Sequence, residues 1–194
     1  MKRSLWATIL SSISDLFPLP LITVQGRVRL LYLAHMEHTE QAIFAAGCFW
    51  GIEKGFLDVP GVTDAESGYT GGHVGNPTYE KVCSDTTGHA EAVRVTFDPS
   101  VVTYEALVKK FFSFHDPTQI NRQGPDVGSQ YRSAVFYLTQ EQKEVAEKIK
   151  QELGPNFFPK PIATEITPAS TFYRAEEYHQ RYFENHPNAV CHIW

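Results

Sequence analysis

The hydrophobic positions of this chain follow two periods from residue 41 onward. Alternating or continuous apolar runs predict strands in the segments 43–46, 62–69, 91–97, 131–138 and 163–166. Apolar residues at helical spacing predict helices in the segments 49–58, 104–115, 139–153 and 175–183. The order strand, helix, strand, strand, helix, strand is that of a split βαβ unit. We therefore predict an α+β fold, a ferredoxin-like split βαβ plait whose mixed sheet is covered by helices, with an extra irregular C-terminal segment.

A segment of different composition precedes this pattern. Its first 35 residues contain one acidic side chain and are rich in leucine, isoleucine and serine, as signal and transit segments are. Polar or helix-breaking residues interrupt its apolar run before the roughly 20 residues that span a bilayer are reached: Asp15, Pro18 and Pro20. We expect a weakly structured leader at 1–38, without stable membrane association, and one domain at 39–194. Targeting to an organelle is the alternative role for the leader.

Composition and charge exclude several classes of function. The 194 residues carry a formal net charge of -5, and 42% of them are hydrophobic, as in ordinary soluble globular proteins. Such a chain offers no basic surface, so we expect no nucleic-acid partner. The three cysteines are far apart and form no Cys-x-x-Cys pair, which argues against a disulfide scaffold or a zinc site and fits a reducing compartment. We expect a cytoplasmic monomer without a bound metal or cofactor.

A cysteine stands where the first predicted strand meets the first predicted helix, in Gly47-Cys48-Phe49-Trp50-Gly51. At a helix N-terminus, free N–H groups and the helix dipole favour the thiolate, which is the nucleophilic form. The alternative is a buried cysteine that acts as a small hydrophobic residue. Backbone room from two glycines favours the reactive interpretation, because an inert core thiol does not need it.

A second candidate group is Glu91, in Gly88-His89-Ala90-Glu91 at the start of a half-buried strand. Desolvation at such a position can raise the pKa of a carboxyl group until it acts as an acid near neutral pH. One alternative is the His-x-Glu motif of a zinc deaminase, but the Pro-Cys-x-x-Cys partner motif is missing. The other is a glutamate that is simply hydrogen-bonded at a strand edge.

Loop residues supply a third set of candidates. Tyr79 follows Asn-Pro-Thr, and the turn 124–132, Gly-Pro-Asp-Val-Gly-Ser-Gln-Tyr-Arg, contains Asp126 and Tyr131. Tyrosine hydroxyls and a carboxylate on loops suit hydrogen bonding to a polar oxygen of a substrate. Each is weak evidence alone, because many tyrosines pack in the core with only the hydroxyl in water.

Four motifs in this order carry a family resemblance. They are the cysteine motif at 47–51, Gly-Tyr-Thr-Gly-Gly at 68–72, Gly-His-Ala-Glu at 88–91 and the turn at 124–132. Together they closely resemble the peptide methionine sulfoxide reductase family, A type, over about residues 42–187. The resemblance implies thiol-dependent reduction of methionine S-sulfoxide, free or in proteins, and hence repair of oxidised proteins. It makes 39–194 a catalytic domain.

The resemblance also implies roles for individual residues. Cys48 attacks the sulfoxide sulfur, and Glu91 protonates the oxygen. The remaining positions bind the substrate: Phe49 and Trp50 hold its methyl group, Tyr79 and Tyr131 donate hydrogen bonds to its oxygen, Asp126 anchors its backbone or an ordered water, and His179 lies near the site.

Turnover requires reduction of the cysteine sulfenic acid that this chemistry leaves. The resemblance implies Cys191 near the C-terminus as the resolving thiol, with thioredoxin as the external reductant. Cys83, between Tyr79 and Glu91, is the weaker candidate. The chain has no second C-terminal cysteine, so direct reduction of Cys48 by a small thiol stays open.

Two other classes of function are weighed against this one. A hydrolase would use Cys48 with His89 or His179 as its base, but it leaves the paired aromatic residues and the tyrosines unexplained. A domain that only binds methionine-containing peptides would not need a reactive Cys48.

Overall fold

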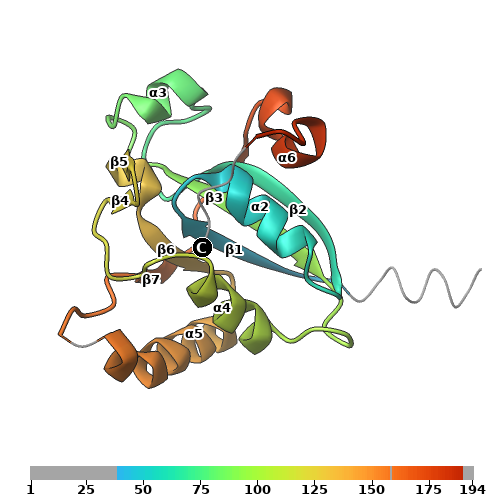
Figure 1. Cartoon of the computed structure of the whole chain (residues 1–194), viewed down its shortest axis with the longest axis vertical. Coiled ribbons are helices and arrows are strands. Elements are labelled where there is room, and N and C mark those ends of the chain that lie inside the picture. The colour runs from blue at the N-terminus through green and yellow to red at the C-terminus, as the bar shows by residue number, and fades with distance from the viewer. Residues whose placement is uncertain (1–38, 158, 190–194) are drawn as a thin grey trace, which may run out of the picture. The chain divides into compact units, whose positions relative to one another are not determined.

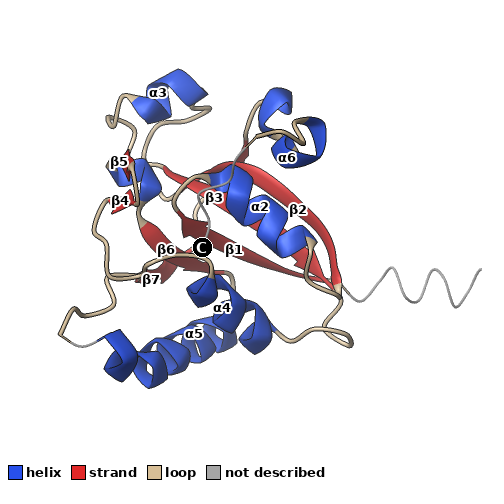
Figure 2. Ribbon diagram, in the orientation of Figure 1, coloured by secondary structure: helices blue, strands red, loops and turns tan. Residues whose placement is uncertain are grey.

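The computed structural model describes residues 39–157 and 159–189, so the predicted leader lies outside the described residues. A sheet of six strands forms the centre of the domain (Figures 1 and 2). In spatial order the strands are β7 (Glu165–Pro168), β6 (Ser133–Tyr137), β1 (Glu40–Ala46), β3 (Ala90–Phe97), β2 (Val62–Thr70) and β8 (Tyr173–Arg174). All neighbours are antiparallel except β6 and β7, which are parallel. Because β3 lies between β1 and β2, the four central strands have the predicted split βαβ order, and the α+β prediction is confirmed.

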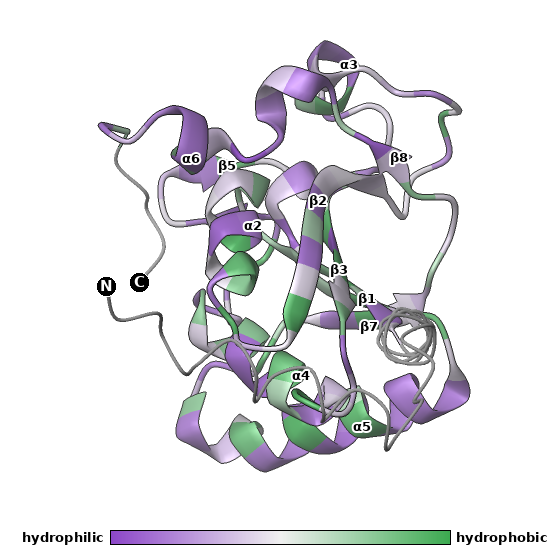
Figure 3. Cartoon of the chain, turned by 90° about the vertical axis from the view of Figure 1, so that its right-hand side faces the viewer, coloured by the Kyte–Doolittle hydropathy of each residue, from purple (hydrophilic) through white to green (hydrophobic). Residues whose placement is uncertain are grey.

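Helices cover one face of this sheet. They are α2 (Phe49–Leu57), which contacts β1, β2 and β3, α4 (Tyr104–Ser113), which contacts β1, and α5 (Gln140–Leu153), which contacts β6 and β7. Shorter elements are α3 (Tyr79–Cys83), α6 (Tyr182–Asn185) and a small hairpin of β4 (Arg122–Gln123) and β5 (Asp126–Val127). Turns of 3₁₀ helix lie at Ser129–Tyr131, Gly154–Phe157 and Glu177–His179. Hydrophobic and hydrophilic segments alternate around α4 and α5, as expected for helices with one face against a sheet (Figure 3).

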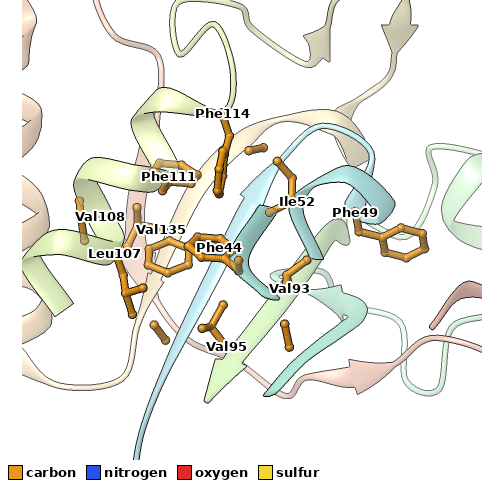
Figure 4. Packing of buried hydrophobic residues seen from close by; sticks show 14 of the residues in the cluster. Phe44, Phe49, Ile52, Val93, Val95, Leu107, Val108, Phe111, Phe114 and Val135 are labelled. Carbon is orange, nitrogen blue, oxygen red and sulfur yellow. The ribbon is translucent and has the colours of Figure 1, made fainter. Parts of the chain in front are cut away.

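The main core lies between the sheet and these helices. Phe44 of β1 is fully buried there and stacks on Phe56 of α2 and Phe111 of α4, with ring centroids 5.0 and 5.2 Å apart. Phe44 and Phe111 are labelled in Figure 4. The alternate residues of β1, Ile43 and Ala45, belong to a smaller cluster on the other face. The period of two in the sequence therefore reports the two faces of the sheet correctly.

The helix predicted at 175–183 is wrong. The segment, which directly follows β8, instead forms a 3₁₀ turn at Glu177–His179 and the start of α6, with Arg181 in a left-handed conformation at φ 49°. The side chain of Gln180 accepts a hydrogen bond from Ser67 N–H at 3.1 Å and donates one to Ser67 O at 3.0 Å. These bonds to β2 favour an extended Gln180, so tertiary contacts override the helical spacing.

Other boundaries shift by a few residues. The strand predicted at 131–138 begins at Ser133, because Ser129–Tyr131 form a 3₁₀ turn, and the strand predicted at 163–166 lies at 165–168. The short helix α3 was not predicted, since five residues are too few to show a helical period. Among the described residues, no helix is long and apolar enough to cross a membrane.

Candidate active site

Cys48 occupies the N-cap position of α2, directly after β1. The chain turns at Gly47, whose φ of +92° suits glycine, and a Cβ there would lie 2.7 Å from the Cβ of Gln123. The Cys48 side chain is half-buried and is not in a disulfide. The structure therefore has the thiol at a helix N-terminus, as the sequence predicted, where the helix dipole favours the thiolate.

Glu91 lies beside the first turn of α2. Residues 91, 93, 95 and 97 of β3 share one face, and 93, 95 and 97 pack in the helix-covered core. The Glu91 side chain is 2% exposed, and its Oε2 accepts a hydrogen bond from the N–H of Phe49 at 3.1 Å. Burial raises the pKa of Glu91 to about 8; the Phe49 N–H opposes this rise, and the charge of Asp126 adds to it. At pH 7 the carboxyl group of Glu91 is therefore protonated, and it is hydrogen-bonded to the residue that follows Cys48.

Three loop residues belong to the same site. Tyr79 is the first residue of α3, Tyr131 is the last residue of the 3₁₀ turn Ser129–Tyr131, and Asp126 lies in β5. Burial raises the pKa of both tyrosines, and electrostatic interaction with Glu91 raises each further. Since Asp126 also interacts with Tyr131 and Glu91, the structure brings the predicted polar groups together, with protonated hydroxyls available as donors.

The two aromatic residues after Cys48 are fixed in different ways. Phe49 is buried in the core, whereas Trp50 is half-buried and stacks on Tyr182 of α6 at a centroid distance of 3.7 Å. The indole Nε1–H of Trp50 donates to Nδ1 of His179 at 3.0 Å. These contacts leave an apolar surface of fixed orientation beside the thiol, which suits a small apolar group of a substrate.

His179 is a buried neutral imidazole. Because Nδ1 accepts the Trp50 bond, the neutral ring carries its proton on Nε2, which has no hydrogen-bond partner within the described residues. Burial lowers the pKa of His179, so the ring is uncharged at pH 7. Its available nitrogen is committed to Trp50, which argues against His179 as the base of a hydrolase.

His89 has a structural role. Its Nδ1 accepts from Gly72 N–H at 3.1 Å, and its Nε2 lies 2.7 Å from the carbonyl oxygen of Val74. Both ring nitrogens therefore bind the backbone of one loop, and neither is available as a metal ligand or a base. In the parts of the chain described here, no group of three or more His, Cys, Asp or Glu residues could hold a metal ion.

Of the two other cysteines, only Cys83 lies within the described residues. Cys83 ends α3 and is exposed, and its thiol lies near enough to the Tyr79 hydroxyl to add to the rise in the pKa of that hydroxyl. It also interacts electrostatically with Glu91, so it lies at the edge of the same site. Cys191, the predicted resolving cysteine, lies outside the described residues.

Sequence reasoning missed three residues that support the site: Tyr69, Glu176 and Tyr182. Their partners are about 100 or more residues away along the chain, as in the hydrogen bond between Tyr69 Oη and Glu176 Oε2. No local period or motif identifies such pairs in one sequence.

Known proteins resemble both the sequence and the fold. A family model described as peptide methionine sulfoxide reductase matches residues 40–194. Peptide methionine sulfoxide reductase MsrA of Methanosarcina acetivorans is 59% identical over 149 residues, which cover 76% of this chain and 79% of the relative. The solved methionine sulfoxide reductase A of Corynebacterium diphtheriae matches with a TM-score of 0.76 and 38% identity, over 80% of this chain and 79% of that chain.

A further solved structure is of Mxr1 from Saccharomyces cerevisiae in complex with Trx2. It matches with a TM-score of 0.56 and 28% identity, over 81% of this chain and 89% of that chain. Family model, sequence relatives and solved structures thus agree with one another and with the motifs around Cys48. The chain belongs to the peptide methionine sulfoxide reductase family and is an oxidoreductase that reduces methionine sulfoxide.

Proposed function

We propose that Cys48 is the nucleophile of this reduction and Glu91 its proton donor. The observation that carries the proposal is the pairing of a thiol at a helix N-terminus with a buried, protonated carboxyl group that binds the next residue's N–H. A nucleophile and an acid are both needed, because the oxygen of a sulfoxide leaves only when it is protonated.

The first step transfers the sulfoxide oxygen to the cysteine. The Cys48 thiolate attacks the sulfoxide sulfur, and Glu91 gives its proton to the oxygen. The attack forms a bond between the two sulfur atoms. As the hydroxyl group then moves from the substrate sulfur to the Cys48 sulfur, this sulfur–sulfur bond and the sulfur–oxygen bond of the substrate both break, which leaves methionine and the Cys48 sulfenic acid. Methionine sulfur is reduced by two electrons, and Cys48 is oxidised by two.

The surrounding residues bind the substrate. Tyr79 and Tyr131 donate hydrogen bonds to the sulfoxide oxygen, and Asp126 anchors the substrate backbone or an ordered water. Phe49 and Trp50 enclose the S-methyl group, whose burial contributes about 1 kcal/mol. His179 holds Trp50 in place through Nδ1. A chiral arrangement of acid, tyrosines and methyl surface selects one epimer, which we assign as S.

A second thiol then restores Cys48. Cys191 condenses with the sulfenic acid to form a disulfide and water, and thioredoxin reduces the disulfide by exchange. The solved complex of Mxr1 with Trx2 supports this route. Cys83 is the alternative resolving thiol, supported by its place at the edge of the site. We further propose that the enzyme is a cytoplasmic monomer that acts on oxidised proteins or free methionine sulfoxide.

Single epimers of a peptide methionine sulfoxide test the proposal. We expect the S epimer alone to be consumed, with dithiothreitol and with thioredoxin, thioredoxin reductase and NADPH. Cys191→Ser retains the dithiothreitol reaction and loses the thioredoxin reaction. Loss of the thioredoxin reaction in Cys83→Ser instead would give the resolving role to Cys83, and turnover by Cys48→Ser would contradict the nucleophile assignment.

A further inference from the structure

Glu176 joins three parts of the fold at the back of the site. Its Oε1 accepts a hydrogen bond from the backbone N–H of Tyr79 at 2.9 Å. Its Oε2 accepts one from the hydroxyl of Tyr69 at 2.8 Å and lies 4.0 Å from Nε2 of His179. One carboxylate thus contacts β2, the start of α3 and the C-terminal segment.

The contact with Tyr79 fixes the beginning of α3. That helix has five residues, and its N-cap Thr78 forms no side-chain cap. A helix this short is not stable alone, so an external acceptor for its first N–H determines where it begins. Because the Tyr79 side chain extends from that same residue, Glu176 fixes the position from which the Tyr79 hydroxyl reaches the site.

The contact with His179 lies next to the contact with Tyr79, because the rings of these two residues pack with centroids 4.5 Å apart. Nε2 carries the proton of the neutral ring and faces Oε2 of Glu176, while Nδ1 accepts from Trp50. A negative charge beside Nε2 favours the tautomer that leaves Nδ1 free to accept. Glu176, His179 and Trp50 therefore form a line that orients the indole next to Cys48.

Glu176 is suited to this by its charge. Partial burial would raise its pKa, but the hydrogen bonds from Tyr79 N–H and the Tyr69 hydroxyl hold the pKa below its usual value. The neighbouring Glu177 has none of these contacts: its side chain is 82% exposed and pairs with Arg174. The two adjacent glutamates offer a matched comparison.

We propose that Glu176 is a positioning residue for methionine sulfoxide reduction, which places Tyr79 through its backbone N–H and Trp50 through His179. The inference rests on the proposed roles of Tyr79 and Trp50. One carboxylate would thus position both a polar residue that contacts the substrate, Tyr79, and an apolar one, Trp50.

The test compares Glu176→Ala with Glu177→Ala in the full chain, assayed with a peptide methionine S-sulfoxide and dithiothreitol. We expect kcat/KM to fall at least tenfold for Glu176→Ala, through both lower kcat and higher KM, and less than twofold for Glu177→Ala. Glu176→Gln, which keeps an acceptor, falls between them. Equal values of kcat/KM for the two alanine variants, measured below their unfolding temperatures, would overturn the proposal.

Two further readouts separate positioning from a merely structural role. In a double-mutant cycle with Tyr79→Phe, the fall in kcat caused by Glu176→Ala should become smaller, because part of it acts through the Tyr79 hydroxyl, whereas the rise in KM that acts through Trp50 should remain. The His179 titration followed by NMR should shift to lower pH in Glu176→Gln, because a facing negative charge is lost while that of Glu80 remains. Falls in kcat that simply multiply in the double variant, or an unchanged His179 titration, would contradict the assignment. A Tyr79→Phe variant with full activity would instead refute the proposed role of Tyr79.

Discussion

The two sides of the active site are built by different means. On one side, Cys48 and Glu91 stand at the end of β1 and the start of β3, neighbouring strands whose backbones are paired along the sheet. On the other, His179 and Tyr182 lie on an irregular segment held to β2 and α2 by side chains. Main-chain hydrogen bonds between strands, and the alternation of side chains along each strand, determine the geometry of the first side. A few side-chain contacts determine the geometry of the second.

This difference bears on how each side responds to substitution. Backbone pairing in β1 and β3 does not depend on any one side chain, so changes at Cys48 or Glu91 should alter chemistry and leave the fold intact. In the C-terminal segment each side-chain hydrogen bond is worth about 1 kcal/mol, and few neighbours can compensate for its loss. Substitutions there should alter geometry and stability together.

The largest effect should come from Cys48→Ser. The change is nearly isosteric at a half-buried site, but a hydroxyl at this position is not an adequate nucleophile, so turnover should fall at least ~10³-fold. Activity with dithiothreitol measures it, and circular dichroism should report an unchanged fold. Residual turnover within tenfold of the native enzyme would show that this side of the site does not carry the chemistry.

Glu91→Gln should lower kcat/KM by about 10²–10⁴-fold, because an amide can accept the Phe49 bond but cannot donate a proton to the oxygen at comparable rate. In the native enzyme, kcat/KM should decline above pH 8 as the carboxyl group loses its proton. A rate profile that stays flat from pH 7 to pH 10 would rule out Glu91 as the acid.

The same carboxyl group should make stability depend on pH. Its pKa is raised from 4.5 to about 8 in the folded protein, so between these values the unfolded chain binds fewer protons than the folded one. The free energy of unfolding therefore falls as pH rises through this window, by up to about 1 kcal/mol per pH unit, and Glu91→Gln removes this contribution. Urea denaturation at pH 5, 7 and 9 measures the free energy of unfolding of both proteins. The stability of Glu91→Gln relative to the native protein should increase with pH.

A smaller effect on rate, but a measurable one on stability, is expected from Gln180→Leu in the C-terminal segment. It removes hydrogen bonds with Ser67 N–H, Ser67 O and Ala175 O, at a cost of about 2–3 kcal/mol. KM should rise because the segment that orients Trp50 loosens, while the rate of Cys48 alkylation by iodoacetamide stays within twofold. The exposed Gln140→Leu is the control, with a change below about 0.5 kcal/mol. A lower alkylation rate would mean that the two sides are not separable.

The sequence alone determined the sheet-built side of this protein. The apolar alternation of β3 and the helical spacing after Cys48 are local patterns, and they correctly predicted the split βαβ order and the place of the thiol at a helix N-terminus. Side-chain periodicity reports which face is buried because it repeats within a few residues. The motifs also identified Glu91, Tyr79, Asp126 and Tyr131 as candidates for one site.

Only the tertiary structure decided how the rest assembles. The predicted helix at 175–183 fails because Gln180 pairs with Ser67, 113 residues away, and Arg181 turns left-handed. The same holds for Glu176, whose partners lie on β2 and α3. Such contacts form only after the sheet has brought distant segments together. A short polar segment has several local conformations of similar free energy, and its long-range hydrogen bonds select one of them.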